Sequence, residues 1–257
     1  MLDPDKIKLN LKTKLIGREI LVYDSTSSTN DIATEYAKNK GNDGLVIFAE
    51  EQTAGRGRAG NKWYSGRSDS ILCSIVLTLS KVNAELLSLT CAVAVAEAIG
   101  RTANSQAKIK WPNDIVLNGK KVAGILVESK MADDGNTYII GVGINCHQKK
   151  GSFGADLQQI ATSIDMESRS KVDRISLAKR LLTSIDYWLT IAEKESEKIT
   201  NQWRNLSIQL GHRVKLIYNG REFLGNCIGI DPEKGLILQL DTGGVRMFDA
   251  AHTSIAK

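Results

Sequence analysis

The sequence from Gly55 to Gly60 combines two arginines with three glycines, in the order Gly-Arg-Gly-Arg-Ala-Gly. Its letters match G-x-G-x-x-G, but a dinucleotide-binding turn needs a strand before it and a helix that opens on its last glycine. Here the apolar, strand-like run 45–50 precedes it, and after a short turn a second such run, 71–77, follows. A kinase glycine-rich loop places Val two residues after the last Gly, where Lys62 stands. The pattern therefore predicts a flexible cationic loop that can close over an anion, and a solvated basic turn is the alternative.

A polar corner is predicted where the first strand gives way to a helix. Ser28, Thr29 and Asn30 precede apolar residues at helical spacing, and Ser28 with Asp31 matches a capping box. The backbone N–H groups at such a helix start point outward. Together with Gln52, which precedes the glycine loop, this corner suits a neutral polar head group such as a ureido or amide ring. A plain helix cap explains Ser28 fully.

A proline interrupts the run Lys110-Trp111-Pro112-Asn113-Asp114. Pro112 cannot donate a ladder hydrogen bond and drives Trp111 toward extended geometry, so it marks a strand end or edge. Asn113 and Asp114 are then expected to face a site instead of a partner strand. There, an amide and a carboxylate can help to hold Mg²⁺ or a nucleotide phosphate. An Asx turn is an equally good interpretation.

Lys120 and Lys121 open the apolar run 122–127. In so apolar a strand one lysine must point inward or lie at a mouth, and a buried ammonium is costly unless it meets an anion. A ligand carboxylate or phosphate is a reasonable partner, and Gly124 would allow close approach of that ligand. The alternative is that both lysines simply flank an Asn-Gly hairpin turn.

Gly141 and Gly143 lie in another apolar run, which ends at Asn145. Glycine weakens a strand and usually marks close approach of a ligand or of another backbone, so Asn145 is a candidate nucleotide contact. The three histidines have no metal-ligand spacing, and neither a Ser/His/Asp nor a Cys/His arrangement is visible. We expect neither a covalent nucleophile nor a structural metal.

The chain of 257 residues is long enough to bury a large core and to hold two domains. Its net charge of +5 suits anionic small molecules and does not by itself indicate nucleic acid. The four cysteines lie far apart without a C-x-x-C pair, which is typical of free thiols in a reducing compartment. Since we find no signal sequence and no run of membrane-spanning length, we expect a cytoplasmic protein without a membrane partner.

Hydrophobic patterns predict strands and helices in the first 208 residues, as in an α+β fold. Strands are expected at 20–23, 45–50, 71–77, 107–111, 114–117, 121–128 and 137–144. Helices are expected after Ser28, over 84–99 and from Asp173 to about Trp203. Asn118-Gly119 is the strongest hairpin signal, and 132–136 is expected to join the last two strands by a turn.

The pattern changes near residue 209. Short runs at 214–218, 223–230, 236–240 and 245–248 are divided by tight turns, which predicts a small SH3-like barrel. We therefore divide the chain into an N-terminal tether (1–19), a catalytic domain (20–208) and a C-terminal domain (209–257).

Five segments together resemble the biotin–protein ligase family. They are Ser28–Asn30, Gln52–Trp63, Lys110–Asp114, Lys121–Glu128 and Gly141–Asn145. They stand in the family's order and spacing, and with the terminal barrel the resemblance covers about 18–257. It implies an α+β fold like that of class II synthetases and biotin ligases, with a mixed β-sheet flanked by helices. It also implies that biotin and MgATP give biotinyl-5′-adenylate, which acylates one lysine of a biotin carboxyl carrier protein.

The resemblance also implies roles for individual residues. The implied catalytic residues are Arg58 and Lys121, and Lys121 would meet the carboxylate or its mixed anhydride. The implied biotin contacts are Ser28, Thr29, Asn30, Gln52, Gly55, Arg56, Gly57, Arg58, Lys121 and Gly124. The implied nucleotide contacts are Arg58, Lys62, Trp63, Asn113, Asp114 and Asn145. Mg²⁺ is expected to come with ATP, without a site made by the protein alone. The closed loop would also keep water from the reactive anhydride.

Two departures from the family pattern affect this interpretation. Asn61 stands where many members have Arg, so one contact to the nucleotide or pyrophosphate is missing or is supplied by Lys62. Only the residues 1–19 precede the first strand, too few for the winged helix-turn-helix of members that also repress transcription. We therefore expect a ligase without repressor function or a nucleic-acid partner.

Other functions stay open at this point. A lipoate or octanoate ligase or transferase would share the fold and the acylation of lysine, although the arginine loop and Lys-Trp-Pro-Asn-Asp belong to the biotin branch. A DNA-binding sensor of biotinyl-adenylate and a binding protein without catalysis are further alternatives. A homodimer through the sheet is compatible with the apolar strands 71–79 and 137–144.

Overall fold

The computed structural model describes residues 1–132, 135–168 and 170–255. The strands of the central sheet are β1 (Ile20–Tyr23), β2 (Val46–Ala49), β3 (Ser70–Ser80), β4 (Lys108–Lys110), β5 (Asp114–Leu117), β6 (Lys120–Ala132) and β7 (Gly135–Asn145). They lie in the order β1-β2-β3-β7-β6-β5-β4. Strand β1 is parallel to β2 and the other neighbours are antiparallel, so the predicted mixed sheet is confirmed.

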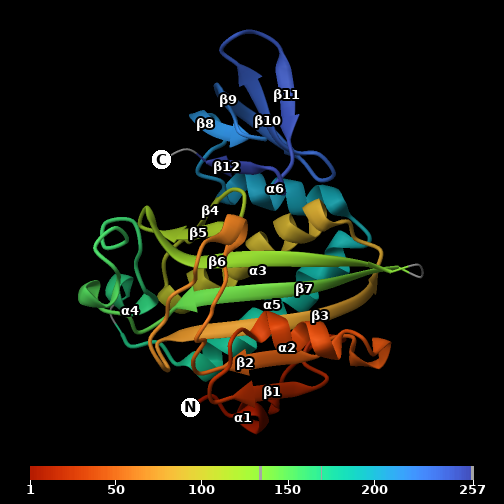
Figure 1. Cartoon of the computed structure of the whole chain (residues 1–257), viewed down its shortest axis with the longest axis vertical. Helices are drawn as coiled ribbons and strands as arrows, with labels where there is room; N and C mark the ends of the chain where they lie inside the picture. The colour runs from red at the N-terminus through yellow and green to blue at the C-terminus, as the bar shows by residue number, and fades with distance from the viewer. Residues whose placement is uncertain (133–134, 169, 256–257) are drawn as a thin grey trace.

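Helices cover the two faces of this sheet (Figure 1). They are α1 (Pro4–Lys8), α2 (Thr29–Tyr36), α3 (Ala84–Ala103), α4 (Ile164–Glu167), α5 (Arg174–Ala192) and α6 (Ser196–Leu206). Helix α2 packs on one face against β2, β3 and β7, and α3 and α5 pack together on the other face. The prediction of one helix from Asp173 to about Trp203 is wrong. The helix is interrupted at Glu195, where φ is −145° and ψ is 65°. The interruption lies in the charged run Glu193-Lys194-Glu195, which has no apolar side chain to bury in the core.

Helix α3 corrects the expectation that no segment reaches membrane-spanning length. By length and composition alone, its 20 residues could cross a membrane. However, 72% of its apolar 18-residue window is buried within the protein, and α3 packs against α5, α6 and β6. One such helix is weak evidence for a membrane span, because the core helix of a globular domain has the same composition.

The two strands considered for a homodimer, β3 and β7, lie inside the sheet. Each pairs on both edges, so neither can pair edge to edge with a second copy. Their apolar residues are explained by helices on both faces. The outer strands in this order are β1 and β4.

The segment 1–19, predicted to be a tether, is packed on the sheet domain. Leu2, Ile7 and Ile16 are fully buried in the main core. The Asp186 carboxylate of α5 accepts hydrogen bonds from the N–H groups of three successive residues, at 2.8, 2.8 and 3.0 Å. These contacts make the segment part of the fold that carries the site.

A second, antiparallel sheet follows α6. Its strands are β8 (Arg213–Tyr218), β9 (Arg221–Asp231), β10 (Gly235–Leu240), β11 (Val245–Phe248) and β12 (Thr253–Ile255). They lie in the order β11-β10-β9-β8-β12, and no pairing among the described residues joins β11 to β12. The structure thus contains the predicted small sheet, but not a closed barrel. Strand β12 was not predicted, because three residues are too few to show a period.

Two turns were predicted in the central sheet, and the first of them lies wholly within the described residues. Asn118 and Gly119 have φ values of +50° and +80°, as the two-residue hairpin requires, and β5 pairs with β6. The predicted turn at 132–136 contains residues 133–134, which lie outside the described residues. The strands on either side of it pair as expected.

Candidate active site

Three glycines allow side chains to lie directly on one face of the sheet. A Cβ on Gly143 would lie 2.6 Å from Trp63 Cε2, and one on Gly124 would lie 3.1 Å from Trp63 Cζ3. A Cβ on Gly141 would lie 2.5 Å from Asn30 Oδ1. Close approach of a ligand or of another backbone was predicted at these glycines, whereas the atoms that approach them in the structure are side chains of this chain. Trp63 and Asn30 are thereby fixed side by side above β6 and β7.

The predicted polar corner is assembled around Thr29. Its N–H and its Oγ1 lie 2.7 and 3.0 Å from Gln52 Oε1, and both residues contribute to a continuous network. Ser74 Oγ of β3 lies 2.7 Å from Thr29 Oγ1 and 2.5 Å from Asn30 Oδ1. Thr29, Asn30 and Ser74 are almost completely buried, so their geometry is fixed before any ligand arrives. Ser74 was not predicted, although a single polar residue within the run 71–77 was a usable signal.

Ser28 caps α2 as predicted. Its side chain accepts a hydrogen bond from the N–H of Asn30 at 3.3 Å. The predicted capping-box partner is wrong, because the Asp31 carboxylate contacts Ser27 Oγ at 3.2 Å and Arg56 at 2.6 Å. Asp31 therefore connects the helix to the cationic loop instead of closing the cap.

The cationic loop is held by its two arginines. Arg56 is ion-paired with Asp31, whereas the Arg58 guanidinium lies 3.1 Å from the Thr253 carbonyl oxygen and also donates to the Ala250 carbonyl oxygen. Arg58 also lies 3.4 Å from Asn113 Oδ1. The loop therefore contacts the helix α2 on one side and the second sheet on the other.

The backbone of the loop accommodates these contacts in a short 3₁₀ turn, Arg58–Gly60, in which Ala59 has a φ of +52°. Gly55 is needed where the loop begins, since a Cβ there would lie 2.6 Å from the Trp63 carbonyl oxygen. The backbones of Arg56 and Lys62 pair in an isolated antiparallel β-bridge, and the Lys62 side chain is exposed. Gly57 has space around it and no positive φ, so we find no steric reason for glycine there.

Ala250 is held from two directions. Arg58 donates to its carbonyl oxygen, and its N–H donates to Glu85 Oε2 of α3 at 3.0 Å. Burial lowers the pKa of Arg58, and the charges of Glu85, Asp114 and Asp249 partly offset this effect. Burial also raises the pKa of Glu85. Arg58 and Glu85 of the sheet domain thus bind the carbonyl oxygen and the N–H of one residue in the loop between β11 and β12.

Lys121 pairs with a carboxylate of this chain, whereas the predicted partner was a carboxylate or phosphate of a ligand. Its Nζ lies 2.5 Å from Asp114 Oδ1 and 5.8 Å from the ring centroid of Trp63. Asp114 was predicted to face away from any partner strand, which is wrong, since it pairs with both β4 and β6. Its side chain nevertheless reaches Lys121. Asn113 donates to the Ile125 carbonyl oxygen at 2.9 Å, which fastens the proline turn to β6.

Asn145, at the end of β7, hydrogen-bonds within the protein at both ends of its amide. Its Nδ2 donates to the Thr162 carbonyl oxygen at 2.9 Å, and its Oδ1 accepts from Gln148 Nε2 at 3.2 Å. The backbone of Thr162 also donates to the Lys121 carbonyl oxygen at 2.8 Å. Asn145 therefore holds the segment 160–162 beside Lys121. This segment has no hydrophobic periodicity from which its position could be predicted.

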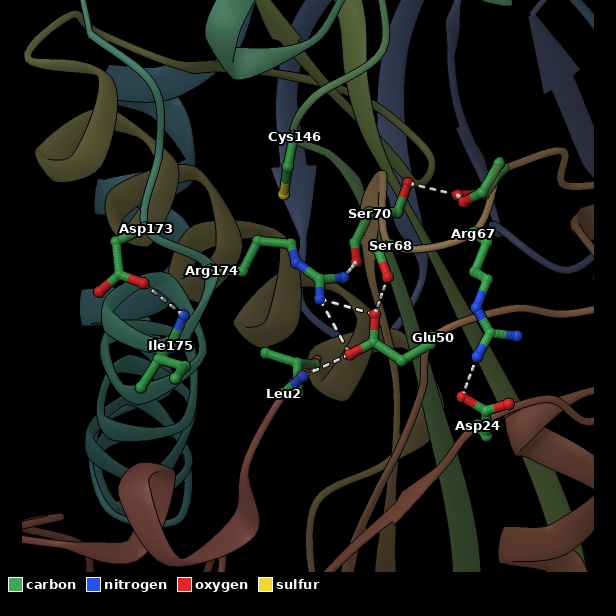
Figure 2. A network of polar contacts seen from close by, with 12 residues as sticks. Leu2, Asp24, Glu50, Arg67, Ser68, Ser70, Cys146, Asp173, Arg174 and Ile175 are labelled. Carbon is green, nitrogen blue, oxygen red and sulfur yellow. Dashed lines mark hydrogen bonds and ion pairs between the residues drawn. The ribbon is translucent and has the colours of Figure 1, made fainter.

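A buried ion pair supports the base of the site (Figure 2). Arg174 at the start of α5 contacts both oxygens of Glu50, at 2.9 and 2.7 Å, and donates to the Ser70 carbonyl oxygen at 3.0 Å. Glu50 also accepts hydrogen bonds from Ser68 Oγ, at 2.5 Å, and from the N–H of Leu2. Because Glu50 follows β2 and precedes Gln52 by two residues, this network fixes the backbone where the cationic loop begins.

The cysteines and the possible metal ligands are the remaining candidate groups. All four cysteines are free and buried, and burial raises the pKa of Cys91 and of Cys146 to about 12. Within residues 1–132, 135–168 and 170–255, no three His, Cys, Asp or Glu side chains are grouped as metal ligands.

This arrangement defines a class of protein: one face of a mixed sheet combines a neutral polar corner with a lysine and a cationic loop. A sequence model of the Biotin/lipoate A/B protein ligase family matches residues 22–145. The chain is 32% identical over 253 residues to the bifunctional ligase/repressor BirA of Bacillus subtilis, covering 97% of this chain and 78% of that one. It is 30% identical over 262 residues to the biotin–[acetyl-CoA-carboxylase] ligase of Mycobacterium tuberculosis, covering 95% of both. The chain belongs to the biotin/lipoate A/B protein ligase family.

A solved structure agrees with this assignment. The biotin protein ligase of Aquifex aeolicus in complex with biotin and ATP has a TM-score of 0.80 and 25% sequence identity. The match covers 93% of this chain and 99% of that chain. It therefore includes residues on both sides of the predicted domain boundary.

Proposed function

We propose that this chain is a biotin–protein ligase. It uses ATP to convert biotin into biotinyl-5′-adenylate, and it transfers the biotinyl group to a lysine of a biotin carboxyl carrier protein. The Mycobacterium tuberculosis relative and the Aquifex aeolicus structure are named for biotin, which supports this function over the lipoate or octanoate alternative. The observation that carries the proposal is that the polar corner and Lys121 share one face of the sheet.

The groups on that face match the two ends of biotin in chemical kind. Asn30 covers Gly141 and Trp63 covers Gly143, so the two side chains are roughly 7 Å apart along β7. Biotin has a neutral ureido ring at one end and a carboxylate at the other. We assign the ring to Ser28, Thr29, Asn30 and Gln52, and the carboxylate to Lys121. A neutral end and an anionic end thus meet matching groups.

The chemistry requires cations near the carboxylate. One carboxylate oxygen attacks the α-phosphorus of ATP and pyrophosphate leaves, so two anions must approach each other. We assign this charge compensation to Lys121 and Arg58. In the second step, a neutral lysine amine of the carrier attacks the carbonyl carbon, and AMP leaves. Trp63, Asn113 and Asn145 are the proposed contacts of the adenylate, and Asp114 holds Lys121 in place.

Mg²⁺ enters this proposal with ATP. Magnesium usually keeps several waters and is bound by one or two carboxylates together with phosphates. Asp114 is paired with Lys121, to which we assign the carboxylate of biotin. The residues present therefore fit a metal that is carried mainly by the nucleotide, and we propose no cage made by the protein alone.

We also infer the domain arrangement. Residues 20–208 form the catalytic domain, to which 1–19 adds buried side chains, and residues 209–257 form an SH3-like domain. Five short antiparallel strands with tight turns support the second assignment. The hydrogen bonds of Arg58 to the Thr253 and Ala250 carbonyl oxygens link the cationic loop to this small domain.

The first test is ATP–pyrophosphate exchange with biotin, lipoate and octanoate in separate reactions. Exchange that depends on biotin alone is expected. Exchange with lipoate or octanoate would instead assign the chain to the other branch of the family. No exchange with any acid would favour a protein that binds its ligand without reacting.

Replacing Arg58 with alanine is expected to leave the fold intact and to release biotinyl-adenylate about tenfold faster, or to abolish its synthesis, because the loop loses its contacts with the second sheet. Retention of radiolabelled adenylate after gel filtration measures this effect. Arg18→Ala is the control, since Arg18 is exposed and its side chain contacts the Lys14 carbonyl oxygen. Retention equal to that of the unmodified protein would remove the loop from the mechanism.

A further inference from the structure

Glu128 contacts both the polar corner and the cationic loop, although the assigned reaction gives it no role. It lies on β6, and its Oε2 accepts a hydrogen bond from Asn30 Nδ2 at 2.5 Å. The same oxygen lies 3.7 Å from a guanidinium nitrogen of Arg56. Arg56 in turn is paired with Asp31 in the first turn of α2. One carboxylate therefore connects a buried amide with the loop above it.

The chemistry of these groups shows why a carboxylate matters at this position. The other partner of Asn30 is Ser74, and a hydroxyl can either donate or accept, so it does not determine which end of an amide faces it. An ionised carboxylate can only accept. Glu128 therefore forces the NH₂ group of Asn30 toward β6 and its oxygen toward Ser74. One N–H of Asn30 remains for a ligand, pointing in a defined direction.

The exposed fractions separate the two contacts of Glu128. The Glu128 and Arg56 side chains are 39% and 41% exposed, so their ion pair is screened by solvent and contributes little. Asn30 is only 4% exposed, and a charge-assisted hydrogen bond to a buried amide is much stronger. The larger effect of Glu128 is thus on the direction of Asn30, and the smaller one is on the loop.

We propose that Glu128 is a positioning residue for biotin recognition, which orients the Asn30 amide toward the ureido ring and secondarily anchors Arg56. This inference rests on the proposed function. Glu128 acts through Asn30 and makes no contact with the reacting carboxylate. It would therefore affect the affinity for biotin more than the rate of the chemical step.

Two variants separate the hydrogen bond from the charge. Glu128→Ala removes both, whereas Glu128→Gln keeps an oxygen, and the Arg56 guanidinium 3.7 Å away favours that oxygen over the NH₂ group at the position that faces Asn30. Glu128→Ala is expected to raise the KM for biotin about tenfold, the effect of losing one strong hydrogen bond, with kcat changed less than about threefold. Glu128→Gln is expected to restore KM to within about threefold of the original value. Glu222→Gln, on the second sheet, is the control for loss of one surface charge.

The outcomes distinguish this inference from a structural role and from failure of the proposed function. An unchanged KM for biotin in Glu128→Ala would overturn it. A fall in kcat as large as the rise in KM, together with a lower melting temperature, would also overturn it. A second measurement needs no activity: the side-chain NH₂ resonances of Asn30 in the ligand-free protein should shift in Glu128→Ala and not in Glu222→Gln. Unchanged resonances would disprove the orientation itself. Absence of any biotin-dependent exchange in the unmodified protein would count against the proposed function only.

Discussion

Replacing Lys121 with alanine is expected to lower biotin-dependent pyrophosphate exchange by about 100- to 1,000-fold, the range found when one preorganised group is removed from a developing charge. Lys121 lies against Asp114 and beside Trp63, where the proposed carboxylate and phosphate meet. Its removal leaves the two anions without this compensation. Initial rates at saturating biotin and ATP measure the change.

Lys120 provides the control within the same strand. It pairs with Leu117 at the end of the hairpin, one residue from Lys121, and carries the same charge. Lys120→Ala is therefore expected to stay within about threefold of the original rate, an energy difference below 1 kcal/mol. Equal losses in the two variants would mean that net charge matters here and that Lys121 has no special place.

Replacing Arg174 or Glu50 alone with alanine is expected to lower the free energy of unfolding by about 3–5 kcal/mol, since either change leaves the other charge buried and unpaired. Their side chains are 8% and 1% exposed. Urea unfolding followed by circular dichroism measures the loss. The double variant Glu50→Leu/Arg174→Met should be more stable than either single variant, and additive losses would contradict the role of the pair.

The exposed pair of Arg67 and Asp24 is the control for this experiment. It lies in the same region (Figure 2), but its side chains are 53% and 60% exposed. Arg67→Ala is therefore expected to change stability little. A loss as large as that of Arg174→Ala would indicate that the local backbone, not the buried charge, determines stability.

The same network determines how stability depends on pH. Burial tends to raise the pKa of Glu50, but hydrogen bonds from Ser68, Leu2 and Arg174 outweigh it, and the pKa falls below its ordinary value of 4.5. The contribution of Glu50 is therefore complete above pH 4.5 and is lost as the pH falls through the folded-state pKa. Above that window, this group adds no pH dependence.

The elements of the fold were largely predictable from local signals. Apolar runs bounded by turn residues gave the strands, and Ser28 and Asn118-Gly119 gave a helix start and a hairpin. The errors have physical causes that act over longer distances. The break at Glu195 and the packing of 1–19 depend on where the core ends, and the interior position of β3 and β7 depends on sheet order.

The site was predicted as a set of segments, without the contacts between them. Asn30, Trp63 and Lys121 do meet on one face, because glycines at matching positions of β6 and β7 leave room for them. Ser74, Glu128 and Arg174 were missed. Each acts through a partner far away in the sequence, and a single polar residue in or beside an apolar run does not identify that partner.

Ala250 accepts a hydrogen bond from Arg58 at its carbonyl oxygen and donates one to Glu85 from its N–H, which has a consequence for dynamics. Rotation of the small sheet away from the large one must break both charged hydrogen bonds. Opening of the cationic loop breaks the hydrogen bond from Arg58 to Ala250. Opening of the loop and rotation of the small sheet are therefore expected to lower the barrier to each other. Hinge motion of the domains and release of the product should then share one relaxation rate, in the microsecond-to-millisecond range of such collective motions.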